Sequence, residues 1–247
     1  MMYMSEEKDR TDASNDKETW ILVTADEVGD LGKKAKWNGT EYKPSKIFGF
    51  GLSIINDMDK FAEISSSYKK ERGIEGEFKA KKRTAFEKMI LAFKIHMSGA
   101  KTYGVYVDKT KDRPKGWKRQ NGLDIQMGTL KRALGEVLSE VESERITIAV
   151  DDERIYHEED EDGNEIRDII GDLSEQLSRE HNKNITCITV GEEDDEFFKQ
   201  METNDLVANA IYDREEKDRS LPSLLMDQKL IRLGKRDSIK NGDILRE

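Results

Sequence analysis

Two aspartates each follow a short apolar segment, and carboxylates placed this way are suited to holding cations. Asp26 comes directly after residues 20–25, and Asp151 directly after residues 146–150. Both segments are rich in β-branched and other apolar residues, which is typical of short buried strands. If the two strands run parallel in one sheet, their carboxyl ends open on the same edge. Carboxylates held close together repel each other unless a cation neutralises them.

Asp205 is a third candidate because it interrupts an apolar stripe. It lies on a predicted helix over residues 196–213, at helical spacing from Phe198, Met201 and Ala208. A carboxylate on that side needs a metal ion, an arginine or a backbone partner. A position at the rim of the core, where the acid reaches water, fits the same spacing equally well.

Two other acids are weaker candidates by position alone. Glu77 precedes the first strongly periodic helix, over residues 84–98, and by itself is an ordinary acid in a charged segment. Asp108 ends a further predicted strand, residues 103–107, and is therefore the main alternative to Asp151.

The predicted elements begin with a hairpin and continue as alternating helices and strands. This order predicts one α/β domain in which a mixed sheet is flanked by helices. The stretch 61–65 fits either a strand or a helix. The glycines Gly49 and Gly51 indicate a bulge or close packing within their strand. The predicted strands are 20–25, 46–55, 103–107, 146–150 and 185–190, and the predicted helices are 84–98, 123–141, 166–177 and 196–213.

The helix over residues 84–98 has a pronounced apolar face. Its spacing places five side chains on one side, which is typical of a helix packed on a core. These residues are Phe86, Met89, Ile90, Phe93 and Met97.

Charge is distributed unevenly along the chain. The net charge of -10 gives no overall attraction to nucleic acid. Residues 69–119, however, contain sixteen Lys or Arg against six Asp or Glu, whereas residues 151–168 contain ten acids against two Arg. A basic middle segment can hold a polyanion, particularly when bound metals neutralise the acids.

Length and composition indicate a folded cytoplasmic protein. The 247 residues suffice for one large domain, and the apolar residues, 35% of the chain, are clustered and periodic. The single cysteine, Cys187, allows neither an internal disulfide nor a cysteine-based zinc site. Residues 1–18 contain no apolar core of a signal peptide, and no apolar run approaches the length of a membrane span, so no membrane partner is expected. We expect a disordered or loosely attached tail at 1–18, a domain at 19–216 and a basic C-terminal extension at 217–247.

The order of these motifs resembles the RNase H-like family known as domain of unknown function 3800. In that family the first strand typically ends in Asp-Glu-Ser-Gly, and the last helix carries Gln-Leu-Ala-Asp-Leu-Val-Ala. Here the matching residues are Asp26-Glu27-Val28-Gly29 and Glu202-Thr203-Asn204-Asp205-Leu206-Val207-Ala208, with Glu77-Phe78-Lys79 near the first helix. The departures, such as Val28 for Ser, affect neighbours of the proposed ligands and put substrate fit and metal geometry in question.

The resemblance implies a metal-dependent nuclease of the RNase H type. Asp and Glu supply the hard oxygen ligands that Mg²⁺ or Mn²⁺ prefers, and two such ions would activate a water and stabilise the leaving oxygen. The resemblance favours Asp151 over Asp108. It assigns Asp26 as the bridging ligand, with Glu77, Asp151 and Asp205 completing the two sites.

The resemblance also suggests how nucleic acid would be held. Lys79 and Lys109 are candidates for contacting phosphate, and Trp117, in the basic stretch 111–119, for stacking on a base. A solvated loop is the simpler interpretation of that stretch. The alternative function is a non-catalytic RNase H-like scaffold that binds a protein partner or nucleic acid without cutting it.

Overall fold

The fold is built on a six-stranded sheet whose strand order is β10-β5-β4-β1-β6-β9. Its strands are β1 (Trp20–Gly29), β4 (Ile47–Ile55), β5 (Lys101–Asp108), β6 (Arg145–Asp151), β9 (Asn184–Val190) and β10 (Lys229–Arg232). The computed structural model describes residues 20–30, 36–37, 40–41, 45–111, 122–151, 157–159, 165–191 and 195–234.

Strand directions make the sheet mixed. β1 pairs antiparallel with β4 and parallel with β6, and β4 pairs antiparallel with β5. β9 and β10 add parallel strands at the two edges. The predicted hairpin and the predicted parallel pairing of the strands that carry Asp26 and Asp151 are both confirmed.

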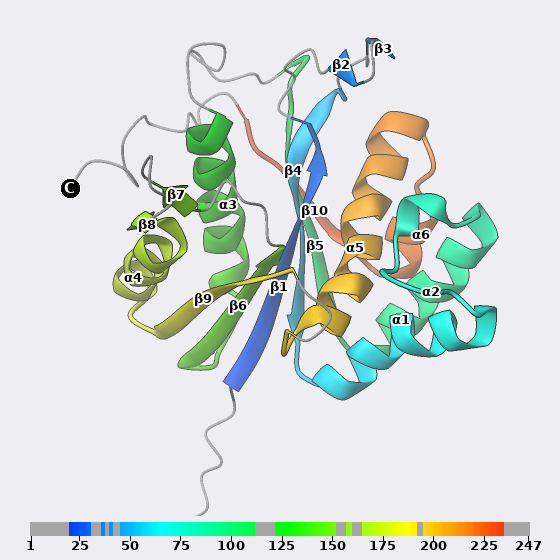
Figure 1. Ribbon diagram of the computed structural model, residues 1–247, viewed down its shortest axis with the longest axis horizontal. Helices are drawn as coiled ribbons and strands as arrows, with labels where there is room; N and C mark the ends of the chain where they lie inside the picture. Colours follow the sequence, from blue (N-terminus) through cyan, green and yellow to red (C-terminus); the bar gives the residue numbers. More distant parts are fainter. Residues whose placement is uncertain are drawn as a thin grey trace, which may run out of the picture.

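Helices cover both faces of the sheet (Figure 1). One face packs against α3 (Gly122–Leu138) and α4 (Ile169–His181). On the other face α5 (Phe198–Lys217) lies on the sheet, and α1 (Met58–Arg72), α2 (Ala85–Ser98) and α6 (Leu221–Leu225) pack on α5 and on one another. The predicted fold class, one α/β domain with a mixed sheet flanked by helices, is confirmed.

Five short elements lie outside the main layers. They are β2 (Lys36–Trp37), β3 (Thr40–Glu41), β7 (His157–Glu159), β8 (Glu165–Asp168) and the 3-10 helix η1 (Ala80–Lys82). β8 occupies residues that were predicted to begin a helix at 166. The helix α4 therefore starts at Ile169, after a short strand that pairs with β7.

The ambiguous stretch 61–65 is part of helix α1. Asp57 caps the N-terminus by accepting the Lys60 N–H at 3.0 Å, and Gly73 ends the helix in the left-handed conformation. The capping residues at its two ends therefore identify this stretch as helix, which hydrophobic spacing alone did not.

The first strand is longer than predicted. β1 does not stop before Asp26 but continues to Gly29, because β4 pairs with it as far as Gly29 and Phe48. The parallel pairing with β6 ends earlier, at Ala25 and Val150. Asp26 thus lies within a strand, at the point where one of its two neighbours ends.

The apolar face predicted for helix α2 points to solvent, and a different face of the helix is buried. Its buried face consists of Lys88, Leu91, Ala92 and Ile95. Phe86, Ile90, Phe93 and Met97, which were predicted to pack on a core, are instead exposed, and Met89 is half-buried. Spacing located the face correctly but could not tell which layer would cover it.

The sheet includes residues beyond 216. β10 pairs with β5 from Lys229–Tyr103 to Arg232–Tyr106, within the stretch predicted as a C-terminal extension. The predicted N-terminal tail lies outside the described residues. Among the described helices, none combines the length and apolarity that crossing a membrane requires.

Candidate active site

Asp26 and Asp151 lie side by side on neighbouring parallel strands. Ala25 is level with Val150 in the β1–β6 register, so the next residues, Asp26 and Asp151, are level too. Neighbouring strands are about 4.8 Å apart, and successive side chains point to opposite faces. Ala25 and Val150 pack into the core under α3 and α4, and both carboxylates therefore face α5.

A glycine opposite Asp26 lets α5 approach the sheet closely. Gly51 pairs with Asp26 across β1 and β4. A Cβ atom at Gly51 would lie 2.5 Å from the Ala208 backbone, so a larger residue here would push α5 away. This is the close packing that the sequence indicated as one of two explanations for the glycines in this strand.

Buried hydrogen bonds fix the turn of α5 that carries Asp205. Asn204 donates from Nδ2 to the Gly51 carbonyl oxygen at 3.0 Å and accepts from Ser53 Oγ at 2.6 Å. Because Asn204 is fully buried, these bonds set the rotation of α5 about its axis. The adjacent Asp205 is thereby directed towards Asp26.

Two acids of α5 hold the loop that precedes η1. Glu202 Oε1 accepts hydrogen bonds from the Phe78 N–H and from Lys69 Nζ, both at 2.7 Å. Asp205 Oδ2 accepts the Ala80 N–H at 2.5 Å. The two bonded amides lie on either side of residue 79, so α5 fixes the backbone on both sides of that position.

The fixed loop delivers two charged side chains to the site. Phe78 is 1% exposed and packs edge-on against Tyr68, with ring centroids 5.9 Å apart. With Phe78 anchored in the core, Glu77 and Lys79 reach the site and form an ion pair with each other. Glu77 thus joins acids that lie far from it in the sequence.

Glu202 is the residue of this site that the sequence reasoning missed. It is 3% exposed and lies three residues before Asp205, on the same side of α5. The available signal was the departure from the family pattern, which places Gln where this chain has Glu202. That change was noted as a difference but not as a second buried acid.

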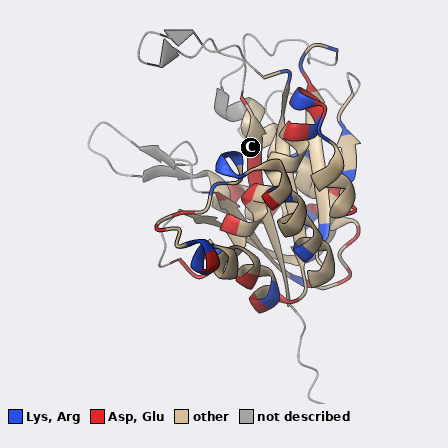
Figure 2. Cartoon of the chain, turned by 90° about the vertical axis from the view of Figure 1, so that its right-hand side faces the viewer, with Lys and Arg blue, Asp and Glu red and all other residues tan. Residues whose placement is uncertain are grey.

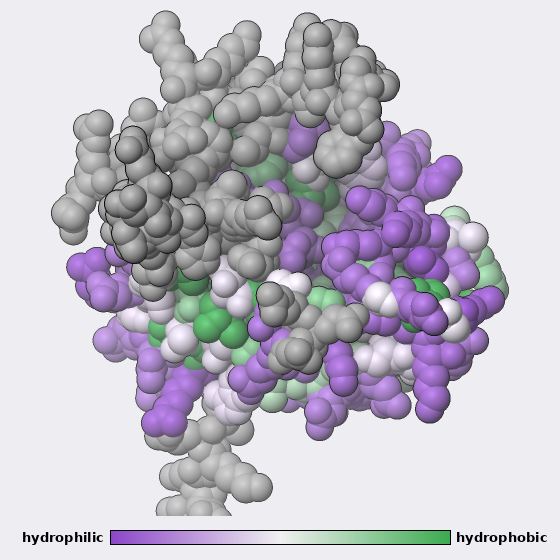
Figure 3. All heavy atoms as spheres, viewed as in Figure 1, coloured by the Kyte–Doolittle hydropathy of each residue, from purple (hydrophilic) through white to green (hydrophobic). Residues whose placement is uncertain are grey.

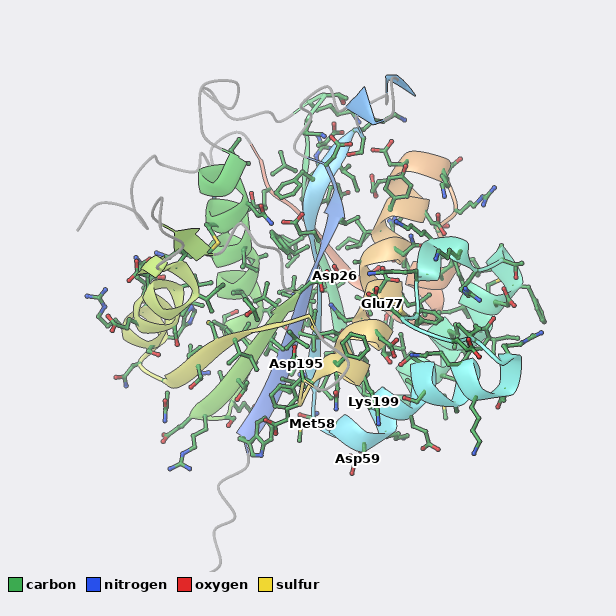
Figure 4. The ribbon with its side chains drawn as sticks, in the orientation of Figure 1. Asp26, Met58, Asp59, Glu77, Asp195 and Lys199 are labelled. Carbon is green, nitrogen blue, oxygen red and sulfur yellow. The ribbon has the colours of Figure 1, made fainter. Side chains whose placement is uncertain are left out.

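These elements enclose a small acidic cavity of about 20 Å³, which is room for about one water molecule or ion. Figure 4 shows Asp26 on β1 and Glu77 on the loop close together beside α5. The basic residue of the lining is Lys79, and its acidic residues are Asp26, Glu77, Asp151, Glu202 and Asp205.

Like charges shift the ionisation of this cavity. Burial raises the pKa of Asp26 well above its usual 3.8, and the neighbouring Asp205 and Asp151 raise it further. Burial also raises the pKa of Asp205, although its bond to Ala80 and the nearby Lys79 oppose the change. Burial disfavours the charged form of Lys79, but the surrounding acids, Glu77 first, outweigh it and raise the Lys79 pKa. Asp26 and Asp205 therefore hold their protons more strongly than exposed aspartates do.

The donor set suits a hard divalent cation better than a soft one. All the acidic donors are carboxylate oxygens, which match Mg²⁺ or Mn²⁺. Among the described residues, no three His, Cys, Asp or Glu side chains are already grouped to hold a metal ion. Glu77 is paired with Lys79, and Asp205 is bonded to Ala80. Metal binding would thus require Glu77 to exchange its lysine partner for the ion.

Asp108, the alternative to Asp151, is placed elsewhere. Gly51 pairs with both Asp26 and Gly104, so Asp108 lies four residues beyond the level of Asp26, about 13 Å along the sheet. Its Oδ1 accepts from the Thr110 N–H at 2.9 Å, and its Oδ2 lies 3.7 Å from Arg232. These bonds close the turn after β5, and the residue does not line the acidic cavity.

Lys109, the other predicted phosphate contact, does not line the cavity either. Lys109 Nζ bonds to Asp30, with Oδ1 at 3.1 Å, and to Ser45 Oγ at 3.3 Å. Its side chain is 7% exposed. Trp117 lies outside the described residues, as do all but the first residue of the basic stretch 111–119.

Comparisons with known proteins give a distant structural likeness. No family model matches the chain. No curated protein matches it either. The chain is similar to a structure described as the PCNA:RNase HII complex from Archaeoglobus fulgidus, with 14% sequence identity and a TM-score of 0.49. The similarity covers 80% of this chain and 75% of the other.

Proposed function

We propose that this protein is a Mg²⁺- or Mn²⁺-dependent phosphodiesterase that cuts nucleic acid in the manner of RNase H-like enzymes. The observation that carries the proposal is the convergence of Asp26, Glu77, Asp151 and Asp205 on one cavity. The four acids come from four separate segments, and their mutual repulsion disfavours such a cluster unless a cation offsets it. The resemblance to the domain of unknown function 3800 family supports the same assignment.

The proposed roles follow from position. Asp26 is affected by both Asp205 and Asp151 and would be the shared ligand of two ions, with Glu77, Asp151 and Asp205 completing the two sites. Because the cavity has room for about one ion with Glu77 paired to Lys79, the second ion would enter only when Glu77 leaves that lysine. The chemistry that such ions supply is the activation of a water nucleophile and the stabilisation of the leaving oxygen. Glu202 would act as a positioning residue, because it holds the Glu77 loop through Phe78.

Basic residues next to the cavity provide a path for the nucleic acid backbone. Lys79 lines the cavity, and Lys81 and Lys82, both exposed, follow it in η1. Arg83 comes next and lies over the Phe78 ring. Cations in this arrangement contact phosphates without regard to base sequence. The net negative charge of the whole protein therefore does not prevent local binding at this edge of the sheet.

The test is cleavage of single-stranded, duplex and hybrid oligonucleotides with Mn²⁺ or Mg²⁺ and with EDTA. Asp26→Asn and Asp205→Asn should each lose activity by at least about 100-fold, since both remove a proposed ligand. Asp59→Asn, an exposed acid on α1, is the matched control and should keep full activity. Equal cleavage by Asp26→Asn and wild type would overturn the proposal.

The second candidate, a non-catalytic scaffold, is favoured by one observation. Lys79 already pairs with Glu77, and the Ala80 N–H bonds to Asp205, so these two acids have partners within the chain. The scaffold predicts nucleic acid binding that does not require divalent ions and is unchanged in Asp26→Asn. A gel-shift titration in EDTA with both proteins separates the two functions, because the nuclease proposal predicts tighter binding when Ca²⁺ or Mg²⁺ is added.

A further inference from the structure

Helix α2 presents a row of large apolar side chains to solvent. The exposed fractions are 67% for Phe86, 41% for Ile90, 53% for Phe93 and 57% for Met97. The opposite face buries Lys88, which is 4% exposed. Single exposed apolar residues are ordinary, but a continuous row of them above a buried lysine is not, and such patches mark contact surfaces.

Helix α6 enlarges this surface. It packs against α2 and exposes Leu221 at 45% and Leu224 at 62%. Figure 3 shows apolar (green) atoms among the polar ones at the right-hand edge of the molecule, in the area of α1 and α2. Figure 2 looks onto this side, where uncharged helix segments lie between charged ones. We call these six residues of α2 and α6 the α2–α6 surface.

The spacing of the α2 row fits another copy of the same helix. The four residues follow at intervals of four, three and four, which is the spacing of a two-helix seam. The intervals read the same in both directions, so two copies can pair antiparallel about a two-fold axis. Phe86 then faces Met97 of the second copy, and Ile90 faces Phe93. The Phe–Met contact brings a thioether to the edge of an aromatic ring, which is favourable.

Charges beside the row are complementary in the same arrangement. Glu87 and Lys94 each follow a phenylalanine of the row and are seven residues apart, so they lie on the same flank of α2. Antiparallel pairing places Glu87 of one copy opposite Lys94 of the other, twice per dimer. Opposite charges on the flanks of a two-helix seam select partner and orientation.

The area is sufficient for a stable pair. Taking about 200 Å² for a fully exposed large apolar side chain, the exposed fractions leave on the order of 650 Å² on the α2–α6 surface. Two copies would together bury about 1,300 Å², which falls within the range of specific protein interfaces.

We propose that a second copy of this chain docks on the α2–α6 surface, forming a two-fold symmetric dimer through antiparallel α2 helices. The proposal does not depend on nuclease activity. It explains why the apolar face of α2 is turned away from the core of its own chain.

The test is the mass of the full-length protein in solution, measured by sedimentation velocity from about 1 to 100 µM. Wild type should be a dimer at the higher concentrations. Phe93→Glu should raise the dimer dissociation constant by about 100-fold, because each dimer loses two buried rings and gains two buried charges. Ser139→Glu adds the same charge at an exposed position after α3, on the other face of the sheet, and should leave the dimer intact.

A second variant tests the orientation of the helices. Lys94→Glu places like charges opposite each other in the antiparallel arrangement, so the dimer should weaken by about tenfold, and less so in high salt. Thermal unfolding by circular dichroism checks that each variant is folded. A monomeric wild type at 100 µM, or a folded Phe93→Glu protein that still dimerises with wild-type affinity, would overturn the proposal.

Discussion

The acidic cavity and the Lys88–Asp213 pair both remove carboxylates from water, but they balance charge in opposite ways. Lys88 Nζ lies 2.5 Å from Asp213 Oδ2 and 2.6 Å from Asn209 Oδ1, and both charged side chains are at most 5% exposed. In the cavity, by contrast, Asp26 has Asp205 and Asp151 as neighbours, and five acids lie together among the described lining residues. The first region pairs its buried carboxylate with a lysine of the same chain, whereas the second gathers acids whose repulsion an added cation would reduce.

The largest expected effect on stability comes from breaking the Lys88–Asp213 pair. Lys88→Met should lower the free energy of unfolding by about 3 kcal/mol, because it leaves a buried carboxylate without its main partner. The loss is at the lower end for buried pairs since Lys217 remains 3.1 Å from Asp213 Oδ1. Urea denaturation measures the loss, and the double variant Lys88→Met/Asp213→Leu should recover most of it. A loss below about 1 kcal/mol in the single variant would show that the pair is not structural.

Glu202→Ala should have the next largest effect, because Glu202 connects the cavity to its supporting loop. Removing the acceptor leaves the Phe78 N–H and Lys69 without a bond, at a cost of about 2 kcal/mol. Glu202→Gln keeps an acceptor for Phe78 and should cost about half as much. Hydrogen exchange at the Phe78 amide should accelerate in the alanine variant and stay slow in the glutamine variant. Equal exchange in both would contradict the positioning role.

Asp26→Asn should change stability in the opposite direction from Lys88→Met. The variant should be more stable than wild type by about 1 kcal/mol at pH 7 without divalent ions, since it removes a carboxyl group whose ionisation burial and the neighbouring acids disfavour. Burial and like charges raise the folded-state pKa of Asp26 above 3.8. The penalty on wild type is therefore absent below pH 3.8 and grows as the pH rises through the folded-state pKa. Urea denaturation at pH 3 and pH 7 tests this, and destabilisation at pH 7 would contradict it.

The smallest expected effect concerns a carboxylate at the surface. The nearby Tyr68 hydroxyl, together with the hydrogen bonds that Glu87 accepts from Thr84 in a capping box, lowers the Glu87 pKa from 4.5 to about 2. Glu87→Gln should cost about 1 kcal/mol or less at pH 7. Because the folded-state pKa is lowered, this stabilisation is present above pH 4.5 and is lost as the pH falls towards 2. Denaturation midpoints of the two proteins should therefore converge at low pH, and a constant difference would contradict the assignment.

Much of the fold could be predicted because the periodicity of apolar residues identifies the strands and helices that build it. The β-branched runs before Asp26 and Asp151 form neighbouring parallel strands. The spacing around Asp205 put that acid on the apolar stripe of its helix but did not distinguish a position in the site from one at the rim of the core; the structure places it in the cavity lining. The close approach of α5 at Gly51 followed from the absence of a side chain there.

Other features depend on contacts that sequence periodicity does not encode. Periodicity defines the faces of α2 but not which face the core will cover, and the buried one contains Lys88 because Asp213 receives it. Lys109 follows its strand as predicted, yet Asp30 and Ser45 bind its ammonium group. Glu202 belongs to the site because it accepts a hydrogen bond from the Phe78 amide, which lies 124 residues away in the sequence.

Anomalous diffraction from crystals soaked in Mn²⁺ tests the central claim most directly. We expect Mn²⁺ peaks in the acidic cavity at about 2.1 Å from carboxylate oxygens of Asp26 and at least one of Asp151, Asp205 and Glu77. The same peaks should be absent in Asp26→Asn and retained in Asp108→Asn, the matched strand-end control. An empty cavity in well-diffracting wild-type crystals at millimolar Mn²⁺, or identical peaks in Asp26→Asn, would contradict the account.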